Sequence, residues 1–108
     1  MVPIVTADVQ KAIEDRVGMD LYIHQETTNG SYQKNRVGAY IRNAIVRFNR
    51  GMIKGTGPYR VGLKMEHGWI YAEGLTHWEL DEQGRLLLAG YDEEGKLTVA
   101  LQLSPTPF

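Results

Sequence analysis

Basic residues cluster in one stretch of the chain that contains no acidic residue. Eight lysines and arginines lie between residues 34 and 64, namely Lys34, Arg36, Arg42, Arg47, Arg50, Lys54, Arg60 and Lys64. The remaining residues hold all thirteen acids and only four bases. Because a local excess of positive charge attracts anions, this stretch predicts an anion-binding surface without identifying the anion.

Arginine, lysine and tyrosine occur in this stretch at spacings typical of strands. Even spacing keeps two residues on one face of a strand, which places Arg60 with Lys64 and Arg42 with Tyr40. A guanidinium beside aromatic rings suits a carboxylate, a phosphate or a stacked base. The candidate anion-binding side chains are Arg42, Arg60, Lys64, Tyr40, Tyr59 and Tyr71. The alternative is an ordinary solvated face, since exposed strands commonly carry lysine and arginine.

Two glycines in the segment Gly-Thr-Gly-Pro offer a second way to hold an anion. Gly55 and Gly57 leave backbone amides open, as anion-binding loops do. The segment is not a P-loop, because it lacks the Gly-Lys-Ser/Thr ending and precedes a predicted strand. The alternative is a tight turn in which glycine supplies the positive φ.

The candidates for metal ligands are the three histidines and Glu26, which lies near His24. His24 and Glu26 are two residues apart on one predicted strand face, and His67 or His77 would have to supply a third ligand. Spacing of two arises often in alternating strands, so the match carries a high false-positive rate. We therefore predict no metal site and no cofactor.

Glu73 and His24 are the candidates for acid and base chemistry. Glu73 follows two aromatic residues on one predicted strand face, where burial would raise its pKa. The alternative for Glu73 is a structural ion pair with Arg60 or Arg42. No second carboxylate and no Gly-x-Ser-x-Gly turn accompany these residues, so no catalytic residue is assigned.

One helix is predicted, over residues 6–17 at the N-terminal end. Thr6 is predicted to cap it and Gly18 to end it, because glycine enters the left-handed conformation cheaply. Its apolar face consists of Val9, Ala12 and Ile13.

Strands and turns are predicted for the rest of the chain. The predicted strands cover residues 21–28, 39–48, 52–54, 59–65, 69–75, 77–80, 85–91 and 96–103. Turns are predicted at residues 29–30, 49–51, 81–84 and 92–95, and a loop at 31–37. Strand 39–48 is partly apolar on both faces, so it is predicted to be central or part of a closed barrel.

This pattern predicts a mainly β fold with one N-terminal α-helix. A small, partly open antiparallel barrel is preferred, because closure hides strand edges, and a β-sandwich is the alternative. With 108 residues, the chain is predicted to form a single domain, residues 1–108. It contains no cysteine, which fits a cytoplasmic protein and excludes disulfides and thiolate nucleophiles. No signal peptide or membrane span is predicted.

Four sequence runs resemble the YojF family of small Firmicute proteins. They are LYIHQETTNGSY, AYIRNAIVRF, IKGTGPYRVGLK and GWIYAEGLTHWELD, and the resemblance covers the chain from about residue 20 onward. The family is of unassigned function and supplies no catalytic residues. The resemblance implies a Bacillus-like source and an association with bacillithiol synthesis, through an N-deacetylase encoded nearby.

Three functions follow as hypotheses. The first is a non-catalytic accessory module that binds a small anion. The second is an interaction protein, either a homodimer or a partner of the neighbouring deacetylase, that uses Trp78, Trp69 and the Pro-rich tail. The third is a small acid/base enzyme. A net charge of −1 disfavours nucleic acid as the partner.

Overall fold

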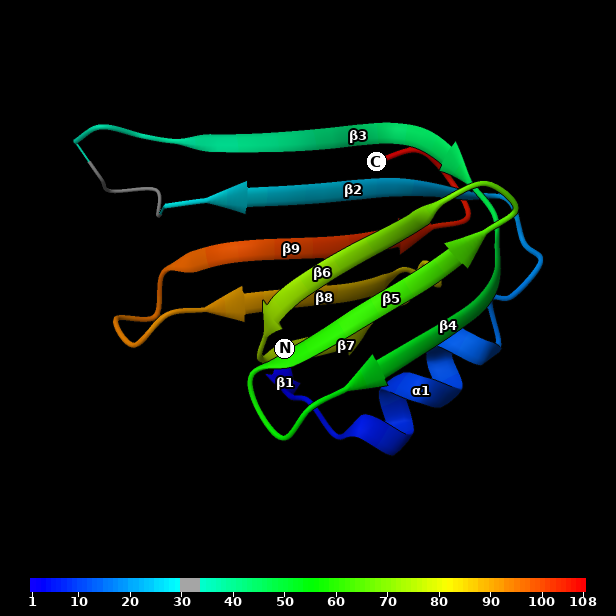
Figure 1. The fold of residues 1–108 in the computed structure, drawn as a ribbon, viewed down its shortest axis with the longest axis horizontal. Coiled ribbons are helices and arrows are strands. Elements are labelled where there is room, and N and C mark those ends of the chain that lie inside the picture. The colour runs from blue at the N-terminus through cyan, green and yellow to red at the C-terminus, as the bar shows by residue number, and fades with distance from the viewer. Residues whose placement is uncertain (30–33) are drawn as a thin grey trace.

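The computed structural model describes residues 1–29 and 34–108, and its architecture is two antiparallel sheets and one helix (Figure 1). The described residues form helix α1 (Thr6–Glu14) and strands β1 (Val2–Pro3), β2 (Leu21–Thr28), β3 (Gly38–Val46), β4 (Phe48–Lys54), β5 (Tyr59–Met65), β6 (Trp69–Leu75), β7 (His77–Leu80), β8 (Leu86–Tyr91) and β9 (Leu97–Ser104). The larger sheet has the strand order β1-β7-β8-β9-β2-β3, and the smaller has β4-β5-β6.

The mainly antiparallel β fold with one helix is confirmed. The smaller sheet lies across the middle of the larger one (Figure 1), and apolar side chains from both fill the space between them. Leu63 comes from β5, while Leu88 and Leu101 come from β8 and β9, and all three are fully buried. No closed barrel forms among the described residues, so the arrangement agrees with a partly open barrel or with its sandwich alternative.

Helix α1 covers the inner side of β4, and the two elements meet closely at Gly51. A Cβ on Gly51 would lie 2.3 Å from Cγ2 of Ile13, so only glycine permits this approach. The side-chain amide of Gln10 donates to the carbonyl of Gly51 (2.9 Å) and accepts from the N–H of Ile53 (3.0 Å). Gln10 thus bonds the free edge of β4 as a neighbouring strand would.

The predicted helix has the right face and the right first residue, Thr6, but its capping residue and its last residue are wrong. Val9, Ala12 and Ile13 are buried as expected. The helix stops at Glu14, and turn hydrogen bonds carry the chain to Gly18, whose φ is +79°. The N-cap is Val5, and no side chain makes a capping hydrogen bond, so Thr6 is not the cap. No helix in residues 1–29 or 34–108 has the length and apolar character needed to cross a bilayer.

Four predicted strands, 21–28, 59–65, 69–75 and 77–80, have the bounds of β2, β5, β6 and β7. The predicted turn at 49–51 is wrong, because β4 runs straight through it from Phe48 to Lys54. Gly51 in that segment serves the contact with α1 rather than a turn. The two-residue strand β1 was not predicted.

Strand β3 is an edge strand, which corrects the prediction that residues 39–48 are central. The chain leaves it after Val46, and Phe48 already belongs to the other sheet. Asn43 has a φ of +62° and forms a bulge, so His24 pairs with Arg42 while the preceding Ile23 pairs with Ala44. The bulge exchanges the two faces halfway along the strand, which is why both looked apolar in the sequence.

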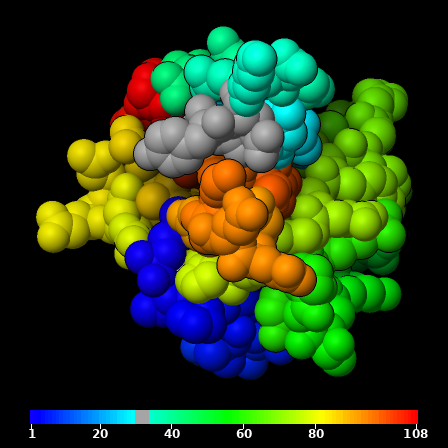
Figure 2. Space-filling view, turned by 90° about the vertical axis from the view of Figure 1, so that its left-hand side faces the viewer, coloured from blue at the N-terminus to red at the C-terminus, as the bar shows by residue number. Residues whose placement is uncertain are grey.

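The predicted turns at 81–84 and 92–95 are confirmed and share one hydrogen-bonding pattern. Asp81 accepts from the backbone N–H of Gln83 and Arg85, each at 2.9 Å. Asp92 accepts in the same way from the residues two and four positions after it. Figure 2 shows the second turn in orange at one end of the molecule, with the N-terminal segment in blue below it. Gly30 of the predicted turn at 29–30 and residues 31–33 of the predicted loop lie outside the described residues.

Candidate functional site

The outward side chains of the smaller sheet form a regular array, which we call the outer face. Strand pairing aligns its nine residues in three rows of three: Arg50, Lys64 and Trp69; Met52, Gly62 and Tyr71; Lys54, Arg60 and Glu73. Cross-strand neighbours have Cβ atoms about 5 Å apart. The array therefore brings four cations, two aromatic rings and one carboxylate onto one surface.

Positive charges on the outer face stand directly opposite one another. Arg50 pairs with Lys64, and Lys54 pairs with Arg60. Like charges in these positions destabilise a sheet. The carboxylate of Glu73 lies 3.4 Å from Nε of Arg60, but both side chains are more than half exposed, so water screens the pair. Among the residues that the structure describes, no ion pair joins Arg50, Lys54 or Lys64.

Two aromatic rings lie flat beside these cations. Trp69 and Tyr71 stack at 5.4 Å between ring centroids, with only 8° between their planes. The guanidinium of Arg60 lies 4.5 Å from the Tyr71 ring centroid, and Lys64 and Arg50 lie 5.7 and 5.9 Å from that of Trp69. The rings hold the cations on the surface by cation–π attraction and leave their N–H groups available to an anion.

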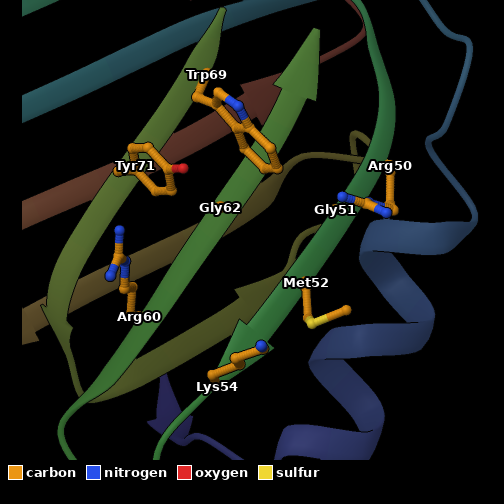
Figure 3. Close-up of a pocket in the computed structure, with 8 residues that line it drawn as sticks. All are labelled: Arg50, Gly51, Met52, Lys54, Arg60, Gly62, Trp69 and Tyr71. Carbon is orange, nitrogen blue, oxygen red and sulfur yellow. The ribbon is translucent and has the colours of Figure 1, made fainter.

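A hollow of about 330 Å³ opens at the centre of the outer face. Figure 3 shows its lining, with Trp69 and Tyr71 on β6, Arg60 on β5, and Arg50, Met52 and Lys54 on β4. Gly62 forms part of this lining, and a Cβ there would lie 3.0 Å from Cε1 of Tyr71. Glycine thus lets the tyrosine ring lie close over β5. The volume is at the small end of the range for ligand pockets.

The comparisons with known proteins agree with each other. Residues 3–108 match the model of the family described as "Protein of unknown function (DUF1806)". The chain belongs to this family. It is 54% identical to the uncharacterized protein YojF of Bacillus subtilis (strain 168) over 114 residues, covering 100% of this chain and 98% of the relative. The crystal structure of Bacillus subtilis YojF aligns with a TM-score of 0.87 and 50% identity, over 99% of this chain and 95% of that chain. The predicted resemblance to the YojF family is confirmed.

Three of the six predicted anion-binding side chains meet on the outer face of this DUF1806 chain. Arg60, Lys64 and Tyr71 share its rows. Tyr59 is instead half-buried against the core.

Gly55 and Gly57 lie in the turn between β4 and β5, with φ of +114° and +119°. The turn interpretation of these glycines fits the backbone, and neither glycine lines the hollow.

Arg42 and Tyr40 lie on β3 in the larger sheet, within a cluster that we call the His24 cluster. His24 is only 6% exposed. Its Nδ1 accepts a hydrogen bond from Nε of Arg42 (3.3 Å), which leaves the proton on Nε2 to be donated to Glu26 (3.1 Å). The rings of Tyr40 and Phe108 lie 6.3 and 6.0 Å from the imidazole. The charged groups of Arg42 and Glu26 thus have a hydrogen-bond partner inside the cluster, whereas the cations of the outer face stand opposite one another.

The C-terminal tail covers the His24 cluster. Asn43 holds Phe108 by both of its backbone groups, with N–H to Oδ1 at 2.8 Å and Nδ2 to O at 3.3 Å. Arg85 lies 5.1 Å from the Phe108 ring centroid and donates to Ser104 Oγ and the carbonyl of Pro107.

Glu73 and His24, the two acid/base candidates, lie in different sheets. Glu73 is exposed on β6 rather than buried between rings. Among the described residues, no three histidine or acidic side chains gather as a metal site. His77 bonds Thr76 Oγ1 at 2.7 Å, and His67 lies in the turn between β5 and β6. Trp78 packs against the core from β7, on the other sheet from Trp69.

Sequence reasoning missed six residues of the hollow's lining as ligand candidates: Arg50, Gly51, Met52, Lys54, Gly62 and Trp69. The turn assigned at 49–51 removed Arg50 from any strand face. A usable signal was present, because Arg50, Met52 and Lys54 alternate with the buried Gly51 and Ile53.

Proposed function

We propose that this protein is a non-catalytic, cytoplasmic binding module whose outer face holds a small anion that carries a ring. The observation that supports it most is the pair of like-charge contacts across β4 and β5. Such contacts reduce the stability of the folded sheet, and an anion placed between them would reverse that effect. Arginine and lysine together supply both a planar fork and mobile ammonium groups for carboxylate or phosphate oxygens.

The stacked rings support the second half of the proposal, a ring in the ligand. The stacked pair leaves Trp69 and Tyr71 about half exposed, at 44% and 45%, so a sugar or planar ring can lie against them. The Met52 side chain borders the hollow on the opposite strand and offers an adaptable apolar contact.

The dimensions of the outer face favour a small molecule over a polymer. Three strands spaced about 4.8 Å apart and rows spaced about 6.8 Å apart give an area of about 10 by 14 Å. That area accommodates one sugar or nucleoside with its acidic group. Single-stranded nucleic acid would require the cations to continue along a groove of several nucleotides.

A dicarboxylate attached to a sugar fits this chemistry well. The two carboxylates of such a compound are too close together to reach both like-charge pairs, so they would bind the cations of one pair while the sugar lies against the stacked rings. The implied association of the family with bacillithiol synthesis makes N-acetylglucosaminyl-malate the first such compound to test.

A thermal-shift panel tests the proposal directly. The compounds are inorganic phosphate, sugar phosphates, malate, N-acetylglucosaminyl-malate and a short oligonucleotide at two salt concentrations. A ligand at about one hundred times its Kd adds about 2.7 kcal/mol to the stability of the folded state. For a chain of this size that raises the Tm by about ten degrees or more.

Two arginine variants provide the matched comparison. Arg60→Ala should reduce the shift to about half or less because it removes a cation from the hollow, and Arg42→Ala should retain it because Arg42 lies in the other sheet. A flat panel would count against the anion site, and a shift that Arg60→Ala leaves unchanged would place the ligand elsewhere. A shift with the oligonucleotide alone would replace the small anion by nucleic acid.

A further inference from the structure

The two sheets have four edge strands, and β3 is the longest of them. Its protective feature is the bulge at Asn43, and no described residue bonds the outward backbone groups of the segment before that bulge. Edge strands expose unpaired backbone groups that can pair with another chain unless something covers them. Gln10 bonds the edge of β4, and the side-chain amide of Gln25 donates to the carbonyl of Tyr71 on β6 at 2.7 Å. Strand β1 has only two residues, one of them a proline. Strand β3 is nine residues long and has no proline or acidic residue.

Apolar side chains are exposed on both faces of β3. Tyr40 is 72% exposed, Ile41 52% and Ile45 63%. The bulge at Asn43 places Ile41 on the face that points towards the smaller sheet and leaves Tyr40, Arg42 and Ile45 on the opposite face. A strand added at this edge would therefore bury apolar surface on both sides of the extended sheet.

The pairing with β2 identifies the backbone groups that point out from this edge. The N–H of Asn29 donates to the carbonyl of Val37, and the N–H of Val37 donates to Oδ1 of Asn29, so the backbone groups of these two residues face each other as in a hydrogen-bonded pair. Hydrogen-bonded pairs alternate along an antiparallel ladder, which makes Ala39 and Ile41 the next residues that bond to β2. The N–H and C=O of Tyr40 and Arg42 therefore point away from the sheet, towards a strand that would lie beside it.

We propose that β3 pairs with β3 of a second copy of this chain, antiparallel about a two-fold axis, with Ile41 opposite Ile41. In this register the outward N–H and C=O of Tyr40 pair with those of Arg42 of the second copy. The outward N–H and C=O of Arg42 pair in turn with those of Tyr40 of the second copy. The guanidinium of each copy then lies beside the tyrosine ring of the other, a favourable contact for an exposed pair.

This self-complementarity is the reason to expect a second copy of the chain, rather than another protein, at the edge of β3. A register shifted by one residue in each copy would place Arg42 opposite Arg42, which is unfavourable. The charge on β3 is a single arginine that already contacts His24, so two copies approach without strong repulsion. The result is one continuous sheet across both copies. This inference does not rest on the proposed anion site, which lies on the other sheet.

Cysteine cross-linking is a sharp test, because the chain contains no cysteine of its own. Residues in a non-hydrogen-bonded pair have Cα atoms about 4.5 Å apart, within the range of a disulfide. Full-length Ile41→Cys treated with oxidised glutathione should therefore form a covalent dimer. Ile45→Cys, on the same strand and equally exposed, should cross-link at least about tenfold more slowly, because its two copies would be about 27 Å apart along the strands.

Sedimentation of the unmodified chain gives the second measurement. Its mass should rise with concentration towards twice the 12.2 kDa of one chain. Ile41→Lys should remain at the mass of one chain, and Leu80→Lys, an exposed apolar position on β7, should behave like the unmodified chain.

Three results would overturn the proposal. The first is a chain that stays monomeric up to about 1 mM, where even an association worth only about 4 kcal/mol would be visible. The second is a dimer that survives Ile41→Lys. The third is cross-linking that is equally fast at positions 41 and 45. Faster cross-linking of Tyr40→Cys than of Ile41→Cys would reject this register.

Discussion

The outer face and the His24 cluster contain the same kinds of residue and use them in opposite ways. Both have an arginine beside a tyrosine and a carboxylate. In the His24 cluster each charge has a buried or half-buried partner, and the tail covers the imidazole. On the outer face the cations stand opposite one another and remain open to solvent. Composition alone does not distinguish a ligand site from a structural cluster, whereas the pairing of charges does.

Removing His24 should have the largest effect. His24→Ala would leave Arg42 and Glu26 without their shared partner and open a cavity beneath Phe108. We expect a loss of about 2 to 4 kcal/mol in the free energy of unfolding, measured by urea denaturation. Arg60→Ala serves as the reference from the outer face and should change stability by less than about 0.5 kcal/mol. Equal losses for the two variants would remove the distinction between the regions.

Replacing Arg60 and Arg42 by alanine, one at a time, distinguishes an effect on anion binding from an effect on stability. Arg60→Ala should weaken the best anion of the panel at least about tenfold, or about 1.4 kcal/mol, while leaving the Tm nearly unchanged. Arg42→Ala should lower stability by about 1 to 2 kcal/mol, because His24 loses its hydrogen-bond donor, and leave the anion's Kd unchanged. Calorimetric titration of both proteins measures the first quantity and thermal melting the second. Any loss of anion affinity in Arg42→Ala would connect the two regions.

Gly62→Ala tests whether the Tyr71 ring contributes to anion binding on the outer face. The added methyl group would approach the Tyr71 ring to 3.0 Å and force it to move. We expect anion affinity to fall about threefold and stability to change by less than about 1 kcal/mol, since the ring is exposed and free to shift. Tryptophan fluorescence should report the movement, because Trp69 stacks on Tyr71. An unchanged spectrum and Kd would show that the ring does not contribute to the site.

The smallest expected effect is a gain in stability. Lys64→Glu would replace one like-charge pair on the outer face by an attractive pair with Arg50. The free energy of unfolding should rise by about 0.2 to 1 kcal/mol while anion binding is lost. Urea denaturation at low and high salt measures the gain, which salt should reduce. A destabilised variant would contradict the view that these cations are arranged for a ligand rather than for the fold.

Local patterns predicted most elements of this fold, and the failures have specific physical causes. Alternation over 59–65 and 69–75 located β5 and β6, because one face of each strand is buried and the other is not. The pattern failed at Gly51, where a glycine serves a helix contact rather than a turn. It failed again at Asn43, where a single left-handed residue exchanges the faces of β3. Neither cause can be predicted without knowing that α1 packs against Gly51 and that β2 pairs with β3 around Asn43.

The site was predicted only in part for the same reason. Arg60 and Lys64 were correctly placed on one face through their spacing within one strand, whereas Tyr71 was grouped with them only as an aromatic residue of the same segment. Arg42 was added to them because charge and aromatic neighbours look alike in sequence, and Arg50 was lost with the false turn. The tertiary structure determines which strands lie side by side, and therefore which cations come together on one surface.

The Gln10 contact couples helix α1 to the outer face, although the helix contributes no residue to that face. The Gln10 amide fixes the backbone on either side of Met52, between the two cations of β4. Anything that frays the helix would therefore loosen Arg50 and Lys54 together, and by thermodynamic reciprocity an occupied outer face would protect the helix. Protease resistance of the first fifteen residues would then serve as a remote indicator of occupancy, measurable without knowing what has bound.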